Sequence, residues 1–126
     1  SIEFLGVLNN EQLPIEIEKS QVCCLPSHME AMPLTWIEVM SMGKPLVASN
    51  LGPGPELIQD TVRGLTCNPF DIDQLAEKVI YMLQHKETAV SMADKARQFA
   101  IENFNLKNVV QKNIDLYHRL KTVSYN

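Results

Sequence analysis

The sequence predicts an α/β fold: a Rossmann-like parallel sheet of about four strands, flanked by helices and followed by a C-terminal helical segment. Two observations lead to this prediction. Short apolar runs alternate with stretches of helical periodicity over residues 1–70, and repeated strand–helix–strand units form parallel sheets through right-handed crossovers. The runs are nearly continuous in apolar or small residues, which is typical of strands covered on both faces.

The expected elements follow one another in strict alternation. Strands are expected at 2–8, 21–25, 45–49 and 64–68. Helices are expected between them, at about 11–19, 33–43 and 55–60. This order favours a sheet whose strands all run the same way, with the helices packed on its faces.

Residues 71–126 contain no further strand pattern. Asp71 and Gln74 have the spacing of a helix N-cap and its third residue, and apolar residues follow at helical spacing to about residue 84. A second helix is expected over 87–102 and a third after Asn105. Four strands with three helices at one end do not make a balanced doubly wound domain. We therefore expect a partial domain, with strand–helix units in 1–70 and C-terminal helices in 71–126.

Composition excludes several classes of protein. The 126 residues are 45% apolar and 21% charged, which is ordinary for one globular domain. A net charge of -4 gives no basic footprint for nucleic acid, and no apolar run approaches the about 20 residues of a membrane helix. The odd cysteine count, with Cys23 and Cys24 adjacent and Cys67 apart, favours small hydrophobes in a reducing compartment over a disulfide framework. We expect a cytoplasmic protein without a nucleic-acid partner.

The helix expected at 33–43 follows the carboxyl end of a strand, where open α/β sheets bind their ligands. Pro33 suits its first turn and Gly43 suits the position just past its end. Its other residues are mostly apolar, so we expect a buried helix with Trp36 in the core and Glu38 embedded in it. Such a carboxylate needs either a cationic partner or ligand hydroxyls.

Glu30 lies in the loop before this helix, so the helix N-terminus lies between two carboxylates. Free amides and the positive end of the helix dipole favour an anion there, and the candidate donors are Met32, Leu34 and Thr35. Glu38 lies about 7.5 Å further along the axis than Pro33. A sugar diphosphate nucleoside has sugar hydroxyls, then two phosphates, then ribose hydroxyls, spaced over a similar length. We expect the neighbouring His28 to be an exposed loop residue.

Several motifs in this order resemble glycosyltransferase family 4, the "glycosyl transferases group 1" family. The resemblance runs from about residue 2 to residue 84 and extends more loosely to Tyr117. The motifs that carry it are Phe4-Leu5-Gly6, Pro26-Ser27-x-x-Glu30, Glu30-x7-Glu38, Met42-Gly43-Lys44-Pro45, Gly52-Pro53-Gly54-Pro55-Glu56 and Gly64-Leu65.

The resemblance implies a role for each site residue. It implies that Glu38 binds the ribose hydroxyls of the nucleotide and that Glu30 contacts the transferred sugar beside the reacting carbon, as the catalytic residue. It implies that the backbone of Met32, Leu34 and Thr35 holds the diphosphate, and that the backbone near Leu8 meets the base. The implied reaction moves a hexose from a UDP- or GDP-linked donor to a growing polysaccharide or lipid-linked glycan. It retains the anomeric configuration and requires neither metal nor cofactor.

The resemblance also implies parts that precede Ser1. These are an N-terminal acceptor-binding domain and the earlier strands that carry the cationic pair facing the diphosphate. In this family the last helix packs on the acceptor-binding domain. We therefore expect the chain to be the truncated half of a GT-B fold, inactive by itself, from an enzyme without a transmembrane segment but compatible with peripheral membrane association.

Two other functions remain open from the sequence. A sugar-nucleotide epimerase uses a similar GT-B domain, although the spacing of Glu30 and Glu38 favours the transferase. A receiver-like interaction domain also has a parallel sheet, but it needs acidic residues at strand ends for a divalent ion. The strands ending at Leu25 and Ser49 offer none.

Overall fold

The computed structural model describes residues 1–122 and has a parallel sheet at its centre. The sheet consists of three strands in the order β1 (Cys23–Leu25), β2 (Leu46–Ser49) and β3 (Leu65–Cys67). Both pairs of neighbours are parallel, and every residue of β2 is buried. The structure therefore confirms the predicted α/β fold with a parallel sheet.

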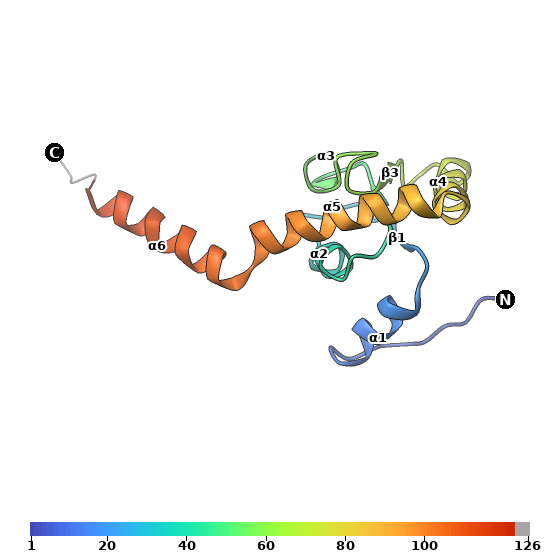
Figure 1. Cartoon of the computed structure of the whole chain (residues 1–126), viewed down its shortest axis with the longest axis horizontal. Coiled ribbons are helices and arrows are strands. Elements are labelled where there is room, and N and C mark those ends of the chain that lie inside the picture. The colour runs from blue at the N-terminus through green and yellow to red at the C-terminus, as the bar shows by residue number, and fades with distance from the viewer. Residues whose placement is uncertain (123–126) are drawn as a thin grey trace.

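Helices cover the sheet and extend beyond it (Figure 1). The three helices that alternate with strands are α1 (Gln12–Lys19), α2 (Leu34–Ser41) and α3 (Gly54–Leu57). The three helices of the C-terminal part are α4 (Ile72–Gln84), α5 (Lys86–Phe104) and α6 (Leu106–Thr122). In Figure 1, α5 runs across the body of the molecule and α6 continues away from it.

Alternate residues of β2 pack into different layers, because successive side chains of a strand point to opposite faces. Leu46 and Ala48 join one core cluster with Trp36 of α2 and with Ala96 and Ala100 of α5. The alanines of α5 let its backbone approach α2 closely. Trp36 has 1% of its surface exposed, which confirms its predicted place in the core.

The opposite face of the sheet packs against the corner between α4 and α5. Val47 and Cys67 join a second core cluster with Met82, Ala89 and Met92. Two layers of helices thus enclose β2, and the sheet holds its loops against a packed scaffold.

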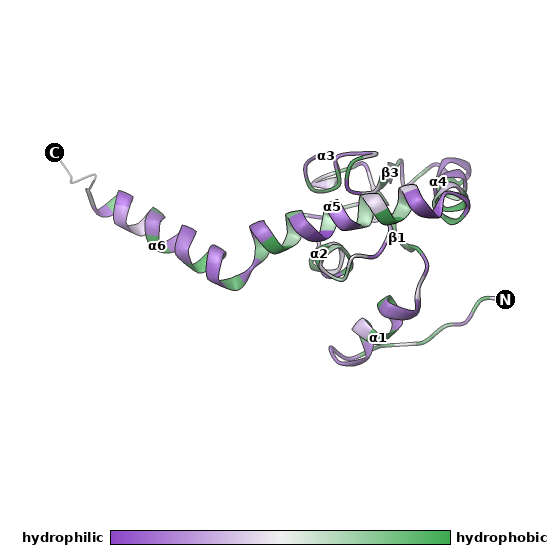
Figure 2. Cartoon of the chain, in the orientation of Figure 1, coloured by the Kyte–Doolittle hydropathy of each residue, from purple (hydrophilic) through white to green (hydrophobic). Residues whose placement is uncertain are grey.

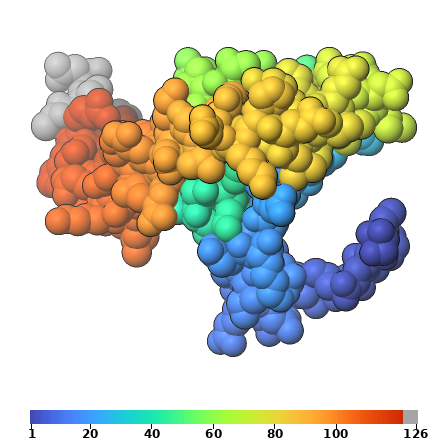
Figure 3. All heavy atoms as spheres, turned by 45° about the vertical axis from the view of Figure 1, so that its right-hand side comes forward, coloured from blue at the N-terminus to red at the C-terminus, as the bar shows by residue number. Residues whose placement is uncertain are grey.

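The fourth expected strand, at 2–8, is absent, and this prediction was wrong. Residues 1–8 contain no strand, and Ile2, Phe4 and Val7 are 85%, 93% and 101% exposed. Figure 3 shows the N-terminal residues and α1 projecting from the body. A strand exists only where its backbone pairs with a neighbour, and the described chain brings none beside this segment.

The predicted starts of two C-terminal helices are confirmed. Asp71 Oδ1 accepts a hydrogen bond from the Gln74 amide at 2.9 Å, as expected of an N-cap. Asn105 Oδ1 accepts one from the Lys107 amide at 2.8 Å, at the start of α6.

Along α6 apolar residues alternate with polar ones (Figure 2). Within residues 1–122, no helix combines the length and the apolarity that a membrane crossing requires.

Candidate functional site

Three loops lie at the carboxyl-terminal edge of the sheet, because all three strands are parallel. They follow β1, β2 and β3 and cover residues 26–33, 50–53 and 68–71. Ligands of open α/β sheets bind in the crevice outside this edge. The sequence-predicted residues Glu30 and Met32 belong to the first of these loops.

The first and second loops touch at Gly52. Gly52 has a φ of +55°, and a Cβ atom built on it would lie 2.7 Å from the carbonyl oxygen of Glu30. Real Cβ atoms do not approach oxygen so closely, so only glycine fits. The backbone of the second loop therefore supports the loop that carries Glu30.

The first and third loops touch through an aromatic pair. The rings of His28 and Phe70 stack with centroids 4.4 Å apart and planes 18° from parallel. Both side chains are exposed, as predicted for His28. The sequence analysis did not single out Phe70. Its position just beyond β3, at the edge where ligands bind, is the signal that could have identified it.

The N-terminus of α2 presents free backbone donors at this edge. The amides of Trp36 and Ile37 donate to the Pro33 carbonyl, at 3.1 and 3.4 Å. Among residues 1–122, the amides of Met32, Leu34 and Thr35 have no acceptor. Pro33 is the N-cap rather than the first helical residue, so these donors lie around it. The predicted anion-binding amides are therefore available.

Glu30 lies beside these donors and is half-buried. Its carboxylate makes no hydrogen bond or ion pair within the described part of the chain. The three loops at this edge contain no lysine or arginine. An anion bound here by this chain would depend on backbone amides and the helix dipole. Lys44 lies at the opposite end of α2, where it pairs with Glu18 at 3.6 Å.

Glu38 is exposed, so the prediction that it is embedded in a buried helix was wrong. Only one face of α2 is buried, and it carries Trp36, Val39 and Met40 at a spacing of three and four residues. Glu38 lies on another face and needs no cationic partner, because water solvates its charge. The sequence analysis offered a cationic partner or ligand hydroxyls for this carboxylate. The structure shows no cationic partner within residues 1–122, so the carboxylate is available to a ligand.

A hollow between α1 and α2 brings Glu38 near the beginning of α1. It is lined by Asn10, Leu13, Pro14, Ile17, Ile37, Glu38, Ser41 and Met42. Leu8 is half-buried and lies two residues before Asn10. Asn9 fixes this turn, because its side chain accepts hydrogen bonds from the amides of Glu11 and Gln12. The predicted ribose-binding residue Glu38 thus lines this hollow, whereas neither Leu8 nor Glu30 is among its lining residues.

The cysteines and possible metal ligands add no chemistry to this edge. Cys67 is fully buried, its thiol donates to the Ala48 carbonyl at 3.5 Å, and burial raises its pKa. All three cysteines are free thiols. Across residues 1–122, histidine, cysteine and acidic side chains form no group of three or more that could hold a metal ion.

Comparison with known proteins agrees with this fold. The sequence model of the family "Glycosyl transferases group 1" matches residues 1–99. A glycogen synthase of Mycobacterium tuberculosis is 31% identical over 114 residues, which cover 90% of this chain and 28% of that protein. A glycosyltransferase of Haemophilus influenzae is 30% identical over 113 residues, covering 89% of this chain and 31% of that protein.

Among solved structures, the sucrose-phosphate synthase of Thermosynechococcus elongatus is similar with a TM-score of 0.87. Its sequence identity is 27%, and the match covers 97% of this chain and 31% of the synthase. The chain therefore has the architecture of part of a GT-B glycosyltransferase and spans about a third or less of the relatives it matches. It belongs to the glycosyl transferases group 1 family.

Proposed function

We propose that residues 1–126 are part of the C-terminal nucleotide-sugar-binding domain of a retaining hexosyltransferase of glycosyltransferase family 4. One observation carries the proposal: the amides of Met32, Leu34 and Thr35, which lie between Glu30 and Glu38 along the chain, have no acceptor among residues 1–122 and surround the start of α2 at the carboxyl-terminal edge of the sheet. The substrate class is a UDP- or GDP-linked hexose. The acceptor class is a growing polysaccharide or a lipid-linked glycan.

The diphosphate of the donor binds at the N-terminus of α2. The amides of Met32, Leu34 and Thr35 supply hydrogen bonds, and the helix dipole supplies positive potential. Both effects strengthen as charge develops on the departing nucleoside diphosphate. These donors therefore stabilise the transition state as well as the bound substrate.

The two carboxylates bind hydroxyl groups on either side of the diphosphate. Glu30 accepts hydrogen bonds from the transferred sugar, and its charge lies beside the anomeric carbon, where positive charge develops. Glu38 accepts hydrogen bonds from the ribose. The hollow that Glu38 shares with Asn10 supports this assignment, because the nearby backbone at Leu8 is then available to the base.

The proposed enzyme contains more than this chain. The matched relatives are about three times as long, which fits an N-terminal acceptor-binding domain and further strands of this domain. Without them the chain binds weakly and transfers no sugar. Three free thiols fit a reducing compartment, so we place the enzyme in the cytoplasm, where peripheral membrane association would bring it to a lipid-linked acceptor.

Titration of the full-length protein with UDP and with GDP by ligand-observed NMR tests this function. We expect saturable binding of one nucleotide and a large loss of affinity in Glu38→Ala. Glu77→Ala is the matched control, because Glu77 is exposed on α4, away from the site. Binding that survives Glu38→Ala unchanged would remove the ribose role. A protein that binds neither nucleotide would contradict the proposed function.

A further inference from the structure

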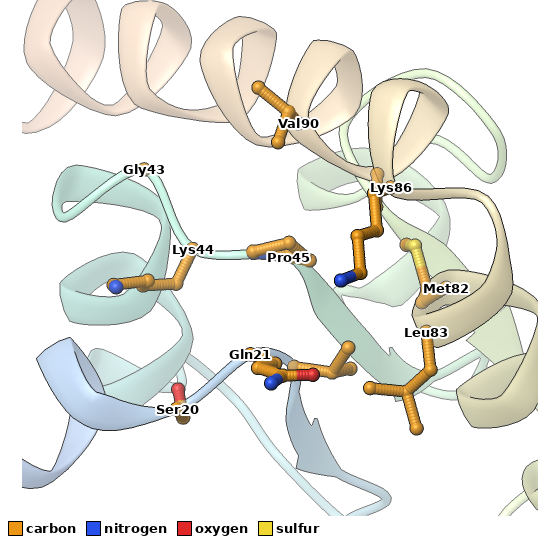
Figure 4. Close-up of a pocket in the computed structure, with 11 residues that line it drawn as sticks. Ser20, Gln21, Gly43, Lys44, Pro45, Met82, Leu83, Lys86 and Val90 are labelled. Carbon is orange, nitrogen blue, oxygen red and sulfur yellow. The ribbon is translucent and has the colours of Figure 1, made fainter.

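A second hollow lies at the amino-terminal edge of the sheet. Its volume is about 330 Å³. Val22 precedes β1 and Pro45 precedes β2, so this hollow and the candidate donor site are at opposite edges. The segments before β1 and before β2 form two of its walls, and the corner between α4 and α5 forms the third, as Figure 4 shows. A ligand here therefore leaves the donor site free.

The floor of this hollow is apolar and anchored in the core. Met82 and Ala89 are 1% and 3% exposed and belong to the core cluster beneath β2 and β3. Val22 packs against the same cluster, and Pro45, Leu83 and Val90 complete the apolar surface. A ligand with an apolar body would bury surface against a rigid wall.

The charge at its rim is positive. Lys44 and Lys86 line the hollow, and none of the lining residues is acidic. The ammonium group of Lys44 donates to the Glu18 carbonyl and pairs with the Glu18 carboxylate at 3.6 Å, so its charge is neutralised outside the hollow. Figure 4 shows its side chain extending away from Pro45.

Lys86 differs from Lys44 both in its bonding partners and in the direction of its side chain. Its ammonium group has no hydrogen bond or ion pair within residues 1–122, and Figure 4 shows it directed into the hollow toward Pro45. The side-chain amide of Gln21 lies on the facing wall and offers a polar neighbour. The hollow thus combines an apolar floor with one uncommitted cation.

We propose that this hollow binds a small amphipathic carboxylate. The apolar body rests on Val22, Met82 and Val90, and the carboxylate pairs with Lys86 and accepts a hydrogen bond from Gln21. A pocket of this size suits a ligand with one or two rings or a branched chain. The turn from Gly43 to Pro45 joins the hollow to α2, whose other end forms the candidate donor site.

Calorimetric titration of the full-length protein with 2-naphthoate tests the proposal, and its neutral analogue 2-naphthamide is the probe control. We expect saturable binding of the acid that Lys86→Gln weakens about fivefold, the size of one partly exposed ion pair. Lys95→Gln is the matched variant, because Lys95 is exposed on the same helix and does not line the hollow. It should leave the affinity unchanged. The amide should bind more weakly, with no response to Lys86→Gln.

A second variant locates the bound probe. Val90 is 55% exposed, so Val90→Glu does not disturb the core and places a like charge in the hollow. We expect it to abolish binding of the acid. Absence of saturable binding, equal affinities for acid and amide, or an unchanged affinity in Lys86→Gln or Val90→Glu would each overturn the proposal. Nucleotide binding is measured separately, so a failure here leaves the proposed function untouched.

Discussion

The backbone of Gly52 lies against the carbonyl oxygen of Glu30, with no room between them for a Cβ atom, which would lie 2.7 Å from that oxygen. This contact joins the loop after β2 to the loop after β1, which precedes α2. Because α2 packs on the core through Trp36, the loop carrying Glu30 is held from two directions. The position of the proposed catalytic carboxylate thus depends on a glycine distant from it in sequence.

Replacement of Gly52 by alanine should displace the Glu30 loop. We expect a loss of about 2–3 kcal/mol in unfolding free energy from backbone strain and steric overlap, together with at least a tenfold loss in kcat/KM. Urea unfolding and donor turnover by the full-length enzyme measure these effects. Gly6→Ala is the control for strain alone, because Gly6 has a φ of +70° and no atom within 4 Å of the added Cβ. Equal destabilisation by the two substitutions would contradict the contact argument.

The two glutamates should affect different kinetic constants. Glu38→Gln should raise the KM for the donor about tenfold with little change in kcat, because the ribose is bound equally in ground and transition states. Glu30→Gln should lower kcat at least a hundredfold, because its charge stabilises the transition state. Steady-state kinetics with Glu77→Gln as control distinguish these effects. A large fall in kcat for Glu38→Gln would refute the division of roles.

Arg63 fixes the short helix behind the second loop. Its guanidinium group donates to the carbonyls of Leu57 and Glu56 and lies 3.9 Å over the ring of Phe99 on α5. Lysine cannot reproduce this planar fork, so Arg63→Lys should cost about 1–2 kcal/mol of unfolding free energy. Thermal or urea unfolding measures the loss. Arg97→Lys, an exposed change on α5, should be nearly neutral. An equal loss of stability in Arg63→Lys and Arg97→Lys would refute the stabilising role of the Arg63 contacts.

Stability should fall in alkaline solution because of Cys67. Burial raises the pKa of this thiol above its ordinary value of 9.0, so the folded state favours the neutral form. The resulting stabilisation is complete below the pKa of the unfolded chain and is lost as the pH rises above it, by at most about 1.4 kcal/mol per pH unit. Urea unfolding between pH 7 and pH 10 measures this slope. Cys67→Ala should make this slope shallower, and an unchanged slope would exclude Cys67 as a source of it.

Local patterns were sufficient to predict most elements. The cap at Asp71, the core position of Trp36 and the three strands of the sheet are encoded in short stretches of sequence. The apolar segment at 2–8 was misread because strand formation needs a partner, and local pattern does not show whether one is present. Likewise, the apolar composition of α2 concealed that Glu38 lies on an exposed face.

Contacts between distant loops were beyond sequence reasoning. The motif at 52–56 contributed to the family resemblance, yet the approach of Gly52 to Glu30 depends on the register of β1 and β2. The stack of His28 on Phe70 depends in addition on β3 lying next to β2. Both relationships arise from tertiary packing, which places residues from separate segments at one edge.

The central claim is that the N-terminus of α2 binds the diphosphate of a nucleotide sugar. Backbone amide NMR of the full-length protein, titrated with UDP or GDP, tests it most directly. The account predicts that the amide signals of Met32, Leu34 and Thr35 shift the most, as their unpartnered N–H groups gain phosphate acceptors. Saturable nucleotide binding that leaves these three signals in place and shifts residues elsewhere would contradict it.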